Sequence, residues 1–82
     1  MDNNNKEVRE YVATFHNHYG ALLFKKKIGE NCFLKPVPRV LSSSCGTAAF
    51  FSLPFSEDMV NEYLEGVFVF ENGAYRRIYG EE

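Results

Sequence analysis

The fold is organised around residues 36–46, PVPRVLSSSCG. Pro36 and Pro38 each fix φ and remove an amide donor, so the chain here is extended and unsuited to a central strand. We therefore expect a loop that joins a strand over residues 32–35 to another over residues 47–52. The remainder of the chain is interpreted as the scaffold that holds this loop.

A cysteine, Cys45, lies in this loop among small polar residues. The thiolate is the nucleophilic form of cysteine, and nearby positive charge or amide donors favour it. Arg39 is the candidate for thiolate stabilisation. The candidates for anion or thiolate contacts are Ser42, Ser43, Ser44 and Gly46. The alternative is a polar connection in which Cys45 fills a small space, as free cysteines often do.

The residues around Cys45 also carry a family resemblance. Val37-Pro38-Arg39, followed by LSSSCG at residues 41–46 and preceded by TFHN at residues 14–17, resembles the selenium/sulfur carrier-like family of small proteins, a domain of unknown function. The resemblance extends from about residue 11 to residue 79. It implies that Cys45 holds sulfur or selenium as a persulfide or selenyl-sulfide. The chain departs from the family at residues 47–51, TAAFF, which lack a basic residue often found there.

The carrier hypothesis and its alternative make different use of the loop. In the first, the Cys45 thiolate accepts sulfane sulfur or reduced selenium from a donor protein and passes it to an acceptor protein, which makes the chain a carrier more than an enzyme. In the second, the chain is a regulatory module that binds a ligand or a protein and uses residues 42–44 as an anion site. Cys45 would then be dispensable. Neither hypothesis calls for a cofactor.

Length and charge limit the class of protein. Residues 8–82 suffice for a single domain with one core, and residues 1–7 are expected to form a disordered tail. A net charge of −2 gives no electrostatic attraction to nucleic acid or to an anionic membrane. The absence of a signal-peptide pattern predicts a cytoplasmic protein with free thiols. The sequence allows a monomer or a small homo-oligomer.

The order of predicted elements is βαββαβ, which is typical of ferredoxin-like α+β sandwiches with two helices on one face of an antiparallel sheet. Apolar periodicity, capping residues and turn residues define the elements. The expected strands cover residues 10–15, 32–35, 47–52 and 67–70, and the expected helices cover residues 18–29 and 56–66. After the turn signal Asn72-Gly73, residues 75–79 are expected to return as an edge strand, with Arg76 and Arg77 facing solvent.

Two other groups of residues, the histidines and Cys32, each allow a structural and a chemical interpretation. His16 and His18 could bind zinc together with Cys45, but the paired spacings of zinc sites are missing, so surface or capping roles are favoured and no metal is expected. Cys32 lies in an apolar strand, which favours a buried inert thiol over a resolving partner for Cys45.

Overall fold

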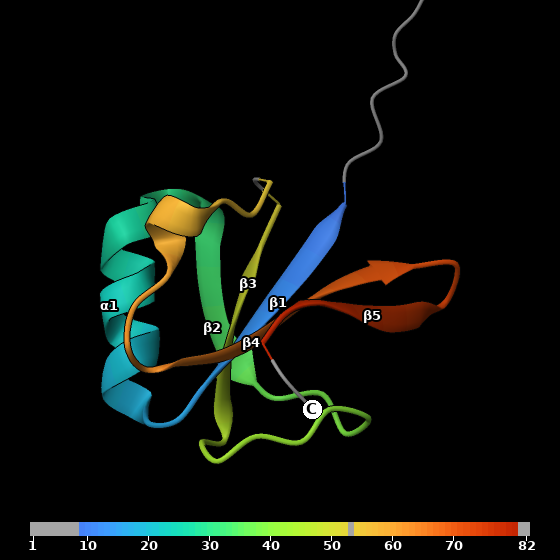
Figure 1. The fold of residues 1–82 in the computed structure, drawn as a ribbon, viewed down its shortest axis with the longest axis horizontal. Helices are drawn as coiled ribbons and strands as arrows, with labels where there is room; N and C mark the ends of the chain where they lie inside the picture. The colour runs from blue at the N-terminus through green and yellow to red at the C-terminus, as the bar shows by residue number, and fades with distance from the viewer. Residues whose placement is uncertain (1–8, 53, 81–82) are drawn as a thin grey trace, which may run out of the picture.

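The computed structural model describes residues 9–52 and 54–80. In chain order the elements are β1 (Glu10–Phe15), α1 (His18–Ile28), η2 (Gly29–Asn31), β2 (Cys32–Pro36), β3 (Thr47–Phe51), η3 (Glu57–Met59), β4 (Leu64–Glu71) and β5 (Ala74–Tyr79), where η marks a 3-10 turn. The strands form an antiparallel sheet in the order β2-β3-β1-β4-β5, with α1 on one side (Figure 1). The chain is therefore α+β, as expected.

The central strand β1 is buried on both sides. Val12, Ala13, Thr14 and Phe15 each expose 2% or less of their surface. None of them is charged, so the strand can pair with β3 and β4 and be covered on both faces without burying an unpaired charge in the core. β1 is therefore the central strand of the sheet, and both of its faces are covered.

Helix α1 forms where its caps and apolar stripe predict. The side chain of Asn17 accepts a hydrogen bond of 3.0 Å from the amide of Gly20, which satisfies a free donor of the first turn. Phe24 packs on the sheet, with its ring centroid 5.3 Å from that of Phe15 and 5.2 Å from that of Phe51. Because β3 lies between β1 and β2, the unit β1-α1-β2 is a split βαβ motif.

The prediction of a second helix over residues 56–66 is wrong. Where residues 56–66 were expected to be helical, the structure has the single 3-10 turn η3, and β4 already begins at Leu64. The side chain of Asn61 accepts a hydrogen bond of 2.8 Å from the amide of Tyr63, a local contact that competes with helical hydrogen bonding. So short a helix is also marginal without strong packing. The two-helix ferredoxin-like sandwich is thus not formed within the described residues.

The hairpin of β4 and β5 is present, with a correction to its arginines. Asn72 and Gly73 have φ of 52° and 80°, as the predicted type I′ turn requires. Neighbouring residues of a strand point to opposite faces, so of the two arginines Arg76 is exposed and Arg77 is not. Arg77 instead lies over the ring of Phe68, at 4.8 Å, and is not the solvent-facing side chain that was expected.

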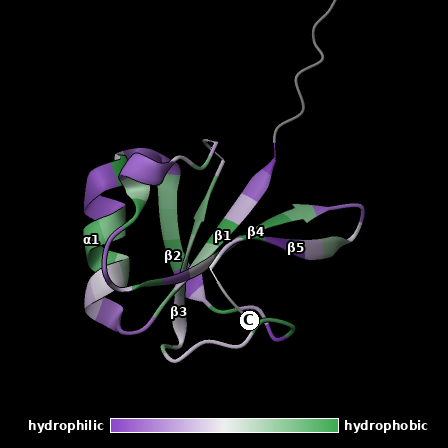
Figure 2. Cartoon of the chain, in the orientation of Figure 1, coloured by the Kyte–Doolittle hydropathy of each residue, from purple (hydrophilic) through white to green (hydrophobic). Residues whose placement is uncertain are grey.

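The main core lies between α1 and the sheet. It contains apolar residues of β1, α1, β2, β3 and β4, and Figure 2 shows hydrophobic residues along β2 and much of β1. Met59 and Val60, in the segment expected to be the second helix, and Phe55 just before it pack against this core. No helix among the described residues is long and apolar enough to cross a membrane. The expected disordered tail over residues 1–7 lies outside the described residues.

Candidate functional site

The loop over residues 37–46 runs from the end of β2 to the start of β3 and lies at the lower edge of Figure 1. A hydrogen bond of 3.0 Å from the amide of Val37 to the carbonyl of Gly46 closes its base. A second bond, of 2.9 Å from the amide of Leu41 to the carbonyl of Pro38, forms a turn at its tip. The loop therefore starts and returns at fixed points of the sheet.

Cys45 is held near the return point of this loop. Its side chain is a free thiol and the residue is half-buried. The amide of Cys45 donates a hydrogen bond of 3.2 Å to Oγ of Ser43, and the amide of Thr47 donates to Sγ of Cys45 at 3.4 Å. An amide aimed at the sulfur stabilises negative charge on it. Cys45 is thus only partly buried, and its sulfur has a backbone donor.

The other predicted site residues are distributed around the loop. Arg39 is exposed in the turn near its tip, and Ser42 is exposed beside it. Gly46 does not have a positive φ, and apart from its two chain neighbours nothing lies within 4 Å of the place where a Cβ would be. The space beside Cys45 is therefore open to another molecule.

Ser43 and Ser44 face a residue that the sequence did not single out, Glu65. Oγ of Ser43 donates to Oε1 of Glu65 at 2.9 Å, and Oγ of Ser44 donates to Oε2 at 3.0 Å. The amide of Ser44 lies 3.4 Å from Oε1, and Nδ1 of His16 lies 3.7 Å from Oε2. The carboxylate therefore ties the loop to the start of β4.

Glu65 was missed because residues 56–66 were interpreted as a helix. In the sheet, Thr14 pairs with Gly66 while the next residue, Phe15, pairs with Leu64, so Glu65 is the extra residue of a β-bulge. Bulges redirect a side chain relative to the regular alternation of the strand. The available signal was an isolated carboxylate between Leu64 and Gly66 in an otherwise apolar run.

The chain was compared with models of known protein families, with curated proteins and with solved structures. Residues 10–79 match the family model described as "Putative Se/S carrier protein-like". The chain belongs to this family. No curated protein and no solved structure matches the chain. The match of the Se/S carrier protein-like family runs from β1 to β5 and includes the whole Cys45 loop.

The two cysteines of this Se/S carrier-like chain lie at opposite ends of the β2–β3 ladder. Cys32 pairs with Phe51 at one end, whereas Cys45 comes two residues before β3 begins at the other. Cys32 has no exposed surface, and burial raises the pKa of its thiol above the ordinary 9.0, with Lys25 acting in the opposite direction. Cys32 is therefore a core thiol and is remote from the loop.

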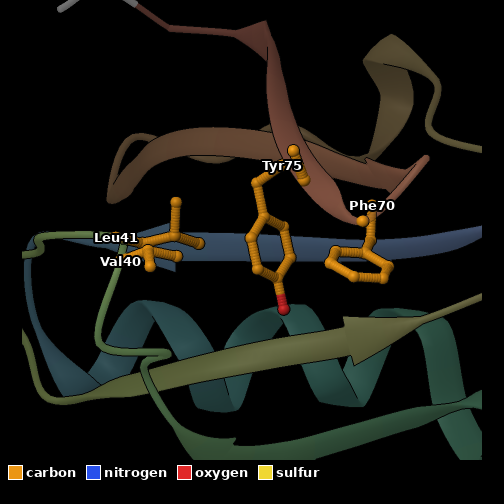
Figure 3. Close-up of a pocket in the computed structure, with 6 residues that line it drawn as sticks. Val40, Leu41, Phe70 and Tyr75 are labelled. Atoms are coloured by element: carbon orange, nitrogen blue, oxygen red, sulfur yellow. The ribbon is translucent and has the colours of Figure 1, made fainter.

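The Se/S carrier-like chain also has a hollow of about 400 Å³ on the sheet face away from α1. Its walls come from the tip of the Cys45 loop and from the β4–β5 hairpin; the lining residues are Val40, Leu41, Phe70, Gly73, Ala74 and Tyr75. Figure 3 shows Tyr75 and Phe70 lying across β1, opposite Val40 and Leu41. Apart from the Tyr75 hydroxyl these side chains are apolar, so the hollow does not suit a small anion.

The histidines do not gather with Cys45 into a metal centre in the described part of the chain. No group of three or more His, Cys, Asp or Glu residues there lies close enough to hold a metal ion. His16 is exposed beside Glu65, and His18 is exposed in the first turn of α1.

Proposed function

We propose that Cys45 carries one atom of sulfane sulfur, or of selenium at the same oxidation level, as a persulfide or a selenyl-sulfide, from a donor protein to an acceptor protein. Membership of the Se/S carrier protein-like family supports the proposal. The observation that carries it is the contact of 3.4 Å from the Thr47 amide to Sγ of Cys45, in a residue that is only partly buried. A thiolate held in this way is stabilised and can also be reached by another protein.

The loading step is a thiol exchange without net oxidation. The Cys45 thiolate attacks the terminal sulfur of a donor persulfide, R–S–SH, and forms a new bond from Sγ to that sulfur. The bond between the two donor sulfurs breaks, and the donor leaves as R–S⁻ with the electron pair. When selenium is the terminal atom, the same step gives a selenyl-sulfide. In delivery an acceptor thiolate attacks that terminal atom, and Cys45 leaves as the thiolate.

Other loop residues have supporting roles in this proposal. Arg39 supplies positive charge near the tip, which favours an anionic persulfide or the Cys45 thiolate. Residues 42–44 fix the backbone before the cysteine, and Gly46 leaves room for the partner. We also propose a reducing compartment such as the cytoplasm, because carrier chemistry needs Cys45 as a free thiol.

The alternative of an anion-binding module has less support. An external anion would need the donors of Ser43 and Ser44, yet both hydroxyls are directed at the Glu65 carboxylate. An external anion would have to displace this carboxylate. The Glu65 carboxylate already occupies the position that a bound anion would take beside Ser43 and Ser44.

Intact-protein mass spectrometry after incubation with glutathione persulfide tests the proposal. We expect the wild type to gain the mass of one sulfur atom and to lose it again on treatment with dithiothreitol. Cys45→Ser should not gain this mass, whereas Cys32→Ala, the matched control, should. Circular dichroism establishes that both variants are folded. Equal loading of the two variants, or a wild type that never loads, would contradict the proposal.

A further inference from the structure

We propose that Glu65 is a positioning residue that holds the Cys45 loop in the geometry needed for loading, an inference that rests on the proposed carrier function. The side chain of Glu65 is three-quarters buried, with 25% of its surface exposed. It meets three donors of the loop, the Ser43 hydroxyl, the Ser44 hydroxyl and the Ser44 amide, at 2.9, 3.0 and 3.4 Å. Hydrogen bonds to an ionised acceptor are about twice as strong as neutral ones.

The connection from Glu65 to Cys45 passes through Ser43. A hydroxyl has one proton to donate and two lone pairs that accept. When Ser43 donates to Glu65, a lone pair remains for the amide of Cys45, which lies 3.2 Å away. The Cys45 backbone is thereby fixed between this bond and the contact of its sulfur with the Thr47 amide.

The two serines depend on Glu65 to different degrees. Ser43 has a second acceptor, the carbonyl of Phe15 at 3.1 Å, which can take its proton when the carboxylate is removed. Among the hydrogen bonds of the described residues, both that involve Ser44 go to Glu65. Loss of Glu65 should therefore free Ser44 more than Ser43.

The β-bulge is independent support for this role. It places Glu65 opposite the junction of Thr14 and Phe15, next to the Phe15 carbonyl that Ser43 contacts. Bulges are frequent beside functional sites, where they direct a side chain away from the regular alternation. Here the bulge directs a carboxylate from a core strand to the loop that carries the cysteine.

The ordering of the loop can be measured without any loading. The variants are Glu65→Ala and Glu65→Gln, and the matched control is Glu71→Ala, which removes a glutamate at the other end of β4 that pairs with Arg76 at 3.0 Å. We expect the ¹⁵N order parameter of Ser44 to fall from about 0.85 to below about 0.6 in Glu65→Ala. The fall should be smaller at Ser43, partial in Glu65→Gln, and absent in Glu71→Ala. An unchanged order parameter in Glu65→Ala would overturn the proposal.

The loading rate with glutathione persulfide shows whether this order serves the chemistry. Glu65→Ala should load Cys45 about tenfold more slowly, with partial recovery in Glu65→Gln and a wild-type rate in Glu71→Ala. Alkylation by iodoacetamide, which needs no fixed approach, should change by less than about threefold, because water screens the lost charge.

Two results would overturn the positioning role of Glu65, and a third would refute the carrier function separately. A disordered loop that loads at the wild-type rate would overturn the positioning role. A parallel fall in loading and alkylation would also overturn it, because Glu65 would then act on the reactivity of the sulfur itself. A wild type that never loads would refute the carrier function, while the order parameters would still decide whether Glu65 holds the loop.

Discussion

Cys32 and Cys45 should differ sharply in their rate of alkylation in the folded protein. The perturbation is iodoacetamide at neutral pH under native conditions. Cys45 is only partly buried and is expected to react directly, whereas Cys32 has no exposed surface and lies in the core with Phe24 and Phe51. Cys32 can therefore react only when the structure around it opens.

The size of the difference follows from the free energy of opening. At the lower bound of about 0.05 kcal/mol per residue, a chain of 82 residues has a free energy of unfolding of about 4 kcal/mol. If exposure of Cys32 requires global unfolding, only about one molecule in a thousand is reactive at any time. The raised pKa of the buried Cys32 thiol adds nothing to this factor, because the thiol is no longer buried once the structure has opened.

Peptide mapping at several reaction times measures both rates in one sample. We expect Cys45 to react about a thousandfold faster than Cys32, and we expect urea to accelerate Cys32 with little effect on Cys45. A ratio below about ten would refute the reasoning, because it would mean that the edge strand β2 opens freely and that Cys32 is not a protected core thiol.

Three further predictions concern the surroundings of the two cysteines. Lys25→Met should lower the free energy of unfolding by about 1 to 2 kcal/mol in urea titrations, because Nζ of Lys25 donates to the carbonyls of Cys32 at 2.6 Å and Gly29 at 3.3 Å; an unchanged midpoint would contradict this. Arg39→Ala should slow alkylation of Cys45 about twofold at neutral pH if the exposed guanidinium acts on the thiolate, since a unit charge one Debye length of about 10 Å away contributes about 0.4 kcal/mol in water; an unchanged rate would mean that Arg39 acts on a partner. Because the pKa of Cys32 is raised on folding, its contribution to stability is complete below pH 9.0 and is lost above it, so the stability of the wild type should fall more steeply than that of Cys32→Ala between pH 8 and pH 10, and parallel curves would contradict the shift.

Local signals were sufficient for much of the fold. The cap at Asn17 and the apolar stripe predicted α1, and the Asn72-Gly73 turn predicted the hairpin of β4 and β5. These features depend on residues that are close in sequence, so a pattern can identify them. The same reasoning failed for residues 56–66, because a capping serine and an apolar stripe do not reveal the competing turn at Asn61.

The candidate site could be proposed from the sequence at Cys45 but not at the residue that supports its loop. Cys45 and its small polar neighbours are contiguous in sequence, so a local pattern singles them out, and the reactivity of Cys45 stays a prediction. Glu65 comes to the loop through the pairing of β1 with β4 and through a bulge, neither of which leaves a local pattern. The position of Arg77 over Phe68 likewise depends on the register of β5 against β4. Contacts of this kind depend on tertiary structure.

The central claim is that the transferred atom is bound to Cys45. The most direct measurement is tandem mass spectrometry of the loaded wild type, after the terminal sulfur has been trapped with iodoacetamide and the protein has been digested. The account predicts that the peptide containing Cys45 carries the additional sulfur between Sγ and the trapping group, and that the peptide containing Cys32 does not. An additional sulfur on Cys32, or its absence from both peptides, would contradict the account.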